Sequence, residues 1–201
     1  VWHPFRNSKP PQATPKELVD IQPTHLAINK PITKEEWVYL RQFHRLLQLN
    51  LNGDWPWIFD YEFEKQSTCL DRLKILVVYG DLSEESTAVL GRLMKQFTQL
   101  TTLDLQGNLY VMFPKLVPYM SGLTALQHLA LWGSSGIRKL NSDGMRKVVS
   151  HLSTLTQLSH LHIENLVDED SVLGLRELIS SHPHLTTLLL SSNYLNPKSN
   201  E

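Results

Sequence analysis

The stretch Leu100-Thr-Thr-Leu103-Asp-Leu105-Gln-Gly-Asn108 decides the fold of this 201-residue chain. It recurs almost intact as Leu185-Thr-Thr-Leu188-Leu-Leu190-Ser-Ser-Asn193. Alternate side chains of a β-strand share one face, so Leu103 and Leu105 are expected to enter the same core. The side-chain amide of Asn108 can then hydrogen-bond backbone groups left free where the chain turns. Each copy therefore predicts one short strand followed by a turn.

The same strand pattern marks seven segments along the chain. Aligned on the last apolar strand position, these segments have the anchors Ile28, Leu51, Val78, Leu105, Leu131, Ile163 and Leu190. Subtraction of these numbers gives intervals of 23, 27, 27, 26, 32 and 27 residues. Repeats of this length bury their apolar edges only by stacking on their neighbours. The spacing therefore predicts one continuous array.

Helical patterns lie between the anchors. Thr33 to Glu36 forms a capping box, and Ser83 can cap a helix that follows it. Apolar stripes at helical spacing comprise Leu90, Leu93, Met94 and Phe97, then Met145, Val148, Val149 and Leu152, and then Val172, Leu175 and Ile179. The acidic run from Asp168 to Asp170 is predicted to start the last helix, because the helix dipole favours negative charge there. Pro183 is predicted to end it.

Two segments depart from this pattern. Between Phe113 and Met120 a second proline removes a helical donor, so a short or 3₁₀ segment is expected. Between Trp55 and Phe63 aromatic residues recur at every second position, which is typical of an extended segment with one aromatic face.

A strand and a helix in each unit of about 27 residues resemble the ribonuclease-inhibitor-like class of leucine-rich repeat proteins. The signature L-x-x-L-x-L-x-x-N is clearest in the fourth and seventh repeats. The resemblance implies an α/β horseshoe with parallel strands on the concave face, helices on the convex face and a concave surface that binds proteins. We therefore expect residues 1–17 to be an extended or disordered lead-in and residues 18–201 to be a leucine-rich repeat domain of about seven repeats. No polar cap follows Leu195, so the array is expected to continue beyond Glu201 or to pair with another surface.

Strand positions between the core leucines should project onto the concave face. Alignment of the repeats brings an aromatic and polar group onto neighbouring strands, and we predict that it binds the partner: Tyr79, Asp104, Gln106, Trp132, His162 and Glu164. Exposed aromatic side chains beside polar groups are typical of interface hot spots. The alternative is that Trp132 folds over a neighbouring loop.

Two chemical alternatives arise from residues near this group. His128, His160 and His162 with Glu164 have ligand types that zinc accepts, but ordinary surface histidines are favoured because no supporting partner can be assigned. An insertion from Gly133 to Lys139 carries Arg138 on a glycine-rich loop and resembles the Ran GTPase-activating proteins, although no catalytic motif accompanies it. We therefore predict no metal, no cofactor and no enzymatic activity.

Composition excludes some classes of function. The net charge of −1 provides no basic field for nucleic acid, and the apolar runs are too short to span a bilayer. Cys69 is the only cysteine, so no internal disulfide can form, and no N-glycosylation sequon is present. These features favour an intracellular setting, or delivery into a host cell. The sequence thus predicts a non-catalytic protein-binding module, such as a host-directed bacterial effector or an intracellular sensor. The alternatives are a GTPase regulator and a recruitment fragment of a larger multidomain protein.

Overall fold

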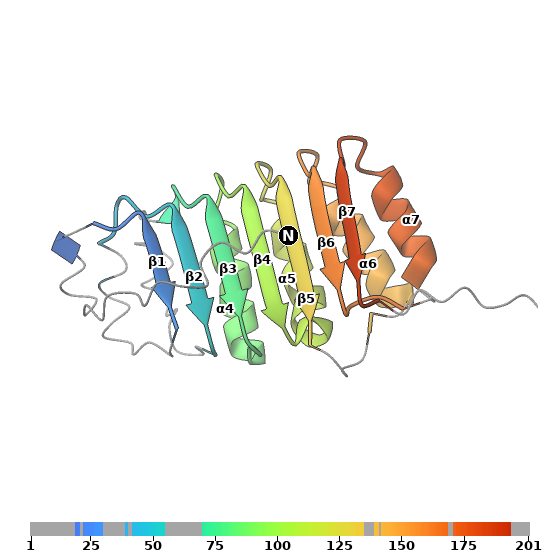
Figure 1. Cartoon of the computed structure of the whole chain (residues 1–201), viewed down its shortest axis with the longest axis horizontal. Coiled ribbons are helices and arrows are strands. Elements are labelled where there is room, and N and C mark those ends of the chain that lie inside the picture. Colours follow the sequence, from blue (N-terminus) through green and yellow to red (C-terminus); the bar gives the residue numbers. More distant parts are fainter. Residues whose placement is uncertain are drawn as a thin grey trace, which may run out of the picture.

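The sheet contains seven parallel strands in the order of the sequence. The computed structural model describes residues 19–20, 22–29, 39, 42–54, 70–134, 139–140, 142–168 and 171–193. The strands are β1 His25–Ile28, β2 Gln48–Asn52, β3 Ile75–Tyr79, β4 Thr102–Gly107, β5 His128–Gly133, β6 His160–Glu164 and β7 Thr187–Ser191. Figure 1 shows them side by side from β1 to β7. All seven predicted anchors lie in strands, which confirms the α/β repeat architecture.

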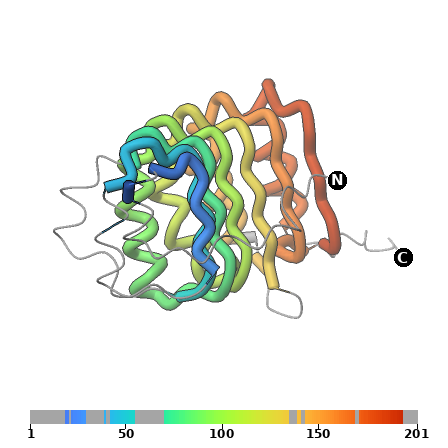
Figure 2. Tube along the Cα trace, turned by 60° about the vertical axis from the view of Figure 1, so that its left-hand side comes forward, coloured from blue at the N-terminus to red at the C-terminus, as the bar shows by residue number. Residues whose placement is uncertain are grey.

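Helices lie behind one face of this sheet. They are α4 Glu84–Met94, α5 Leu109–Met120, α6 Ser142–Leu152 and α7 Val172–Ser180. Figure 1 shows them on a single side, and Figure 2 shows the chain winding from strand to helix and back in successive coils. We use "concave face" for the sheet face turned away from these helices. That face is not covered by the described helices.

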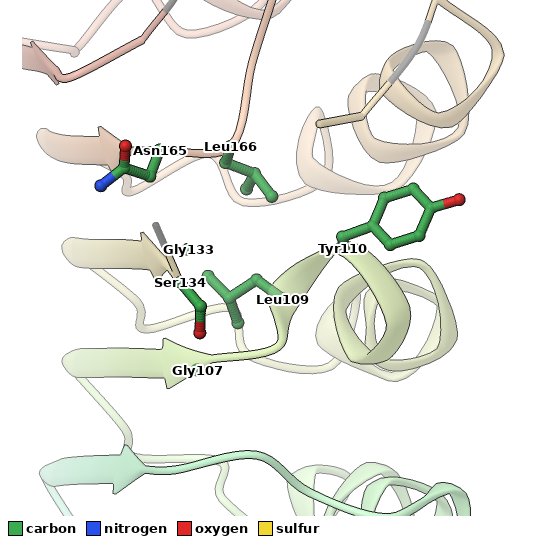
Figure 3. A pocket seen from close by; sticks show the side chains of 7 residues that line it. All are labelled: Gly107, Leu109, Tyr110, Gly133, Ser134, Asn165 and Leu166. Atoms are coloured by element: carbon green, nitrogen blue, oxygen red, sulfur yellow. The ribbon is translucent and has the colours of Figure 1, made fainter. Parts of the chain in front are cut away.

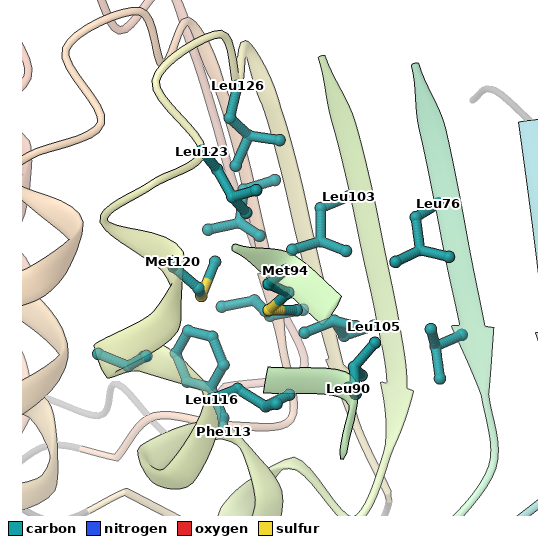
Figure 4. Packing of buried hydrophobic residues seen from close by; sticks show 14 of the residues in the cluster. Leu76, Leu90, Met94, Leu103, Leu105, Phe113, Leu116, Met120, Leu123 and Leu126 are labelled. Carbon is teal, nitrogen blue, oxygen red and sulfur yellow. The ribbon is translucent and has the colours of Figure 1, made fainter. Parts of the chain in front are cut away.

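The core fills the space between the sheet and the helices. Leu103 and Leu105 of β4 are fully buried there, with exposed fractions of 0%. Figure 4 shows their side chains pointing toward residues of the helical layer, including Phe113 and Met120 of α5. Because alternate strand residues fill this core, the intervening residues are directed to the concave face.

The predicted cap of the first described helix is confirmed. Ser83 precedes α4, and its hydroxyl oxygen accepts a hydrogen bond from the Ser86 backbone N–H at 3.2 Å. Glu84 and Glu85 occupy the first turn, where the helix dipole favours negative charge. The predicted stripe that includes Leu90 and Met94 is buried, which orients α4 against the sheet.

The prediction of a short or 3₁₀ segment between Phe113 and Met120 is wrong. Helix α5 spans twelve residues and contains both Pro114 and Pro118. Each proline removes only one backbone donor, whereas the helix buries a continuous apolar stripe: Leu109, Met112, Phe113, Leu116, Val117 and Met120. Packing of this stripe on the core outweighs the local preference against helix.

The predicted stripe of α7 is also wrong in part. Leu175 is buried, but Val172 and Ile179 are 44% and 39% exposed. The buried face instead includes Gly174 and Leu178. A Cβ atom on Gly174 would lie 2.6 Å from Met145 Cγ, so the glycine allows α7 to approach α6 closely. This close approach rotates the helix relative to the orientation that its apolar spacing suggests.

The start of α7 differs as well. The helix begins at Val172 after the N-cap Ser171, so its first turn contains no acidic residue. Asp168 lies upstream, and its carboxylate accepts hydrogen bonds from the backbone N–H and the hydroxyl of Ser171. It therefore supports the residue that precedes the helix rather than the first turn.

Turn side chains connect neighbouring repeats. The Asn108 side chain accepts a hydrogen bond from the Leu82 N–H at 3.1 Å and donates one to the Leu82 carbonyl at 3.0 Å. Asn193 similarly accepts from the N–H groups of Leu166 and Val167 and donates to the Ile163 carbonyl. The predicted role of these amides is confirmed, and their partners lie in the preceding repeat. Such bonds fix each strand relative to the next.

Several predicted features lie outside the described residues. They are the lead-in 1–17, the capping box from Thr33 to Glu36, the aromatic run from Trp55 to Phe63, Arg138, and the chain after Asn193. Among the helices that the structure describes, none has the length and apolar character needed to cross a membrane.

Candidate functional site on the concave face

The strand register brings the six predicted partner-binding residues together. Tyr79, Gln106, Trp132 and Glu164 form one row across β3 to β6, because each is paired with the next. Asp104 of β4 and His162 of β6 lie in the adjacent row, separated by Ala130 of β5. We call these six residues the central patch: Tyr79, Asp104, Gln106, Trp132, His162 and Glu164. Their role in binding remains a prediction.

Trp132 connects both sides of the central patch. Its ring centroid lies 4.1 Å from that of His162 on β6, at an interplanar angle of 65°. On the other side it approaches Asp104 of β4 closely enough to favour the charged form of that carboxyl group. The indole therefore spans from β4 to β6 above β5, and both contacts are with strand residues. This position places a large, partly exposed aromatic group at the middle of the concave face.

Asp104 is the electrostatic centre of the patch. Burial raises its pKa to about 6, although the side chains of Gln106 and Trp132 act in the opposite direction by favouring the carboxylate. Asp104 Oδ1 and Trp132 Nε1 are both buried, and neither makes a hydrogen bond of normal geometry. Buried polar atoms usually have such a partner, and a missing one costs about 1–3 kcal/mol. These two atoms therefore mark a place where bonding is incomplete in the free protein.

The charge of Asp104 also affects Tyr79 on the neighbouring strand β3. The pKa of Tyr79 is raised, mainly because the phenol is partly buried and also because Asp104 is near. The tyrosine hydroxyl therefore stays protonated and can donate a hydrogen bond at neutral pH. The patch thus combines a carboxylate, a phenol and an amide beside the indole.

His162 and Glu164 form the β6 side of the patch. His162 Nε2 lies 3.6 Å from Glu164 Oε2, and 3.4 Å from Ser191 Oγ of β7. Burial lowers the pKa of His162, while the charge of Glu164 opposes this effect. The histidine is therefore charged only at lower pH than an unperturbed imidazole. Ser191 was not among the predicted residues, but it follows Glu164 in the same row and could have been found from the register.

The other two histidines pair with each other in a neighbouring row. His128 and His160 stack with ring centroids 4.2 Å apart. The pKa of His128 is lowered by burial and, to a smaller extent, by the nearby His160. Among the residues that the structure describes, no group of three or more His, Cys, Asp or Glu side chains is placed to hold a metal ion.

A shallow notch lies at the carboxyl ends of the central strands. Figure 3 shows its lining, which consists of Gly107, Leu109, Tyr110, Gly133, Ser134, Asn165 and Leu166. Its interior leaves no room for a water molecule. The notch therefore offers no space for a small substrate, and the concave face provides the better candidate site.

Comparison with known proteins supports the fold. No family model matches the chain, and no curated protein matches it. Among the solved structures, the C-terminal domain of tropomodulin from Caenorhabditis elegans is similar, with a TM-score of 0.52 and 8% sequence identity. The match covers 86% of this chain and 93% of that chain. The similarity concerns the fold alone, and together with the parallel sheet it supports a leucine-rich-repeat-like architecture.

Proposed function

We propose that the chain is a non-catalytic recognition module that binds another protein through the central patch. The observation that carries this proposal is the register, which gathers Tyr79 and Trp132 with polar side chains on adjacent strands. Aromatic residues surrounded by polar groups are enriched at the centres of protein interfaces. The opposite face of the sheet is occupied by the core, so the concave face is the part of the sheet left for a partner.

The strands present this patch rigidly. Each is paired along its length with its neighbours, and the turn amides of Asn108 and Asn193 tie consecutive repeats together. A surface that is already ordered loses little conformational entropy when it binds. A few anchor residues can therefore supply most of the affinity, and Trp132 offers the largest apolar area among them.

The test is quantitative affinity capture from a cell lysate with three matched baits. They are the unaltered chain, the concave variant Trp132→Ala and the convex control Lys147→Ala, whose parent side chain is exposed on α6. We expect the same protein to be retained by the unaltered chain and by Lys147→Ala, and to be lost from Trp132→Ala. Calorimetry with the recovered protein should then show a loss of about 2 kcal/mol or more for Trp132→Ala. Retention by Trp132→Ala together with loss from Lys147→Ala would place the partner on the helices instead.

The proposed setting is inside a cell, as an intracellular sensor or as an effector delivered into a host. A GTPase regulator and a recruitment fragment of a larger protein remain alternatives. Arg138, the residue on which the GTPase hypothesis depends, lies outside the described residues. A GTPase turnover assay with Arg138→Ala as the control variant separates that alternative from simple binding.

A further inference from the structure

Fixed charges are distributed unevenly between the two faces of the molecule. In the seven described strands, Asp104 and Glu164 are the acidic residues, and no lysine or arginine is present. The four described helices carry both signs, with cations at Arg92, Lys115, Arg146, Lys147 and Arg176. With its histidines neutral, the concave face of the described strands therefore presents only negative charge. A partner of matching chemistry brings positive charge to it.

The two carboxylates lie on either side of the partly exposed Trp132. Asp104 and Glu164 lie on β4 and β6, on either side of Trp132 of β5. Neighbouring strands are about 4.8 Å apart, and Glu164 lies two residues beyond the position on β6 that is level with Asp104, so the backbones of the two acidic residues are about 12 Å apart. Glu164 already lies 3.6 Å from His162, whereas Asp104 Oδ1 is buried beside the Trp132 indole without a hydrogen bond of normal geometry. Asp104 is therefore the carboxylate whose bonding a donor from a ligand can complete once its buried oxygen is uncovered.

We propose that the central patch recognises an arginine-bearing segment of its partner protein, whose guanidinium group pairs with Asp104 beside Trp132. This inference rests on the proposed function and adds the chemistry of the partner. A guanidinium presents five donors in a planar fork, which matches a carboxylate and its neighbouring acceptors. Gln106, whose side chain interacts with Asp104, and Tyr79, which is close enough to be affected by its charge, carry further acceptor oxygens in the patch. Because Asp104 Oδ1 is buried in the free protein, this pairing requires the indole of Trp132 to rotate away from it, and the negative charge of Glu164 adds attraction from β6.

Arginine fits this patch better than lysine for two reasons. Its guanidinium is more weakly hydrated than an ammonium group and stacks on aromatic rings, so it loses less on entering a partly buried aromatic site. In addition, Asp104 is already largely removed from water in the free protein, so the desolvation of the carboxylate is mostly incurred on folding and not on binding.

The test uses defined peptides with the ¹⁵N-labelled chain. The probe is acetyl-Gly-Arg-Gly-Arg-Gly-amide, and its matched neutral control replaces both arginines with citrulline, which keeps the shape but removes the charge. A third peptide carries glutamate at the same positions. We expect the arginine peptide to shift the Trp132 indole resonance saturably, and the citrulline and glutamate peptides to bind about tenfold more weakly or not at all. Asp104→Asn should reduce arginine binding about tenfold, while Asp143→Asn on the exposed surface of α6 should leave it unchanged.

Several outcomes would overturn the inference. Equal binding of the arginine and citrulline peptides would show that the positive charge plays no part in recognition. Shifts confined to the helices, or unchanged binding by Asp104→Asn, would remove the role of this site. A different result would reject the proposed function itself, namely capture of a protein from lysate that does not depend on Trp132. Capture that requires Trp132 but survives both Asp104→Asn and Glu164→Gln would retain the proposed function and reject the arginine chemistry.

Discussion

Replacement of Asp104 by asparagine should make the protein more stable at about pH 7.5. Burial raises the pKa of this carboxyl group from 3.8 to about 6 in the folded chain. The folded state therefore holds a proton that the unfolded state releases between these two pH values. Stability contributed by the protonated group is complete below pH 3.8 and is lost as the pH rises from there through about 6. Above that pH the folded protein carries a charge that its surroundings disfavour.

The size of this effect follows from the pKa shift. The shift is about two pH units, and each unit corresponds to about 1.4 kcal/mol, so the upper limit is about 3 kcal/mol. Asparagine has a similar shape and cannot ionise. We therefore expect Asp104→Asn to increase the free energy of unfolding by about 1–3 kcal/mol at about pH 7.5 and to change it little at about pH 3.5.

Urea denaturation at both pH values measures this difference. Asp71→Asn is the matched control, because Asp71 is an exposed carboxylate outside the central patch. A loss of stability in Asp104→Asn at about pH 7.5 would refute the reasoning, since it would mean that the carboxylate is well satisfied in the free protein. A stabilised variant that binds the arginine peptide less well would show that the residue is retained at the expense of stability.

Three further predictions concern the core, a turn and pH. Leu105→Ala should lower the free energy of unfolding by about 2–5 kcal/mol in chemical denaturation, because the side chain is fully buried; a change near zero would contradict its place in the core. Gly107→Ala should lower the free energy of unfolding by about 2–4 kcal/mol in the same assay, because φ is +133° and the added Cβ would lie 2.1 Å from the Gly80 carbonyl oxygen. An unaffected variant would show that this turn can relax. Affinity for the arginine peptide should fall as the pH drops below about 6, and fluorescence titration measures this change. Asp104 loses its negative charge there, and His162, whose pKa is lowered from 6.5, then gains a positive charge. Constant affinity between about pH 7.5 and 5 would show that neither group faces the ligand.

The fold could be predicted from the sequence largely because the residue pattern that specifies each strand spans only a few neighbouring positions. Leucines at alternate positions define each strand, and their recurrence at about 27 residues defines the stacking and the register. The prediction failed where packing overrode local preference. Pro118 lies inside a helix because the stripe around it is buried, and α7 is rotated because Gly174 packs on Met145. Neither contact is visible in the spacing of apolar residues.

The site could be predicted only in outline. Register alone places Trp132 between Gln106 and Glu164, because equivalent positions of successive repeats become neighbours. The spacing does not encode the burial of Asp104 or the incomplete bonding between its carboxylate and the indole. Both depend on the side-chain rotamers and on the neighbours that cover them. The chemistry of the patch therefore emerges only in the folded structure.

The most direct test of the central claim is site-specific photo-crosslinking with the protein recovered by affinity capture. One variant carries p-benzoylphenylalanine in place of Thr102, which lies on the concave face of β4 beside the central patch. The matched variant carries it in place of Lys147 on the exposed side of α6. We predict a crosslinked complex from position 102 and none from position 147. A complex formed from position 147 alone would show that the partner binds the helical face and would contradict the assignment of the concave face as the binding site.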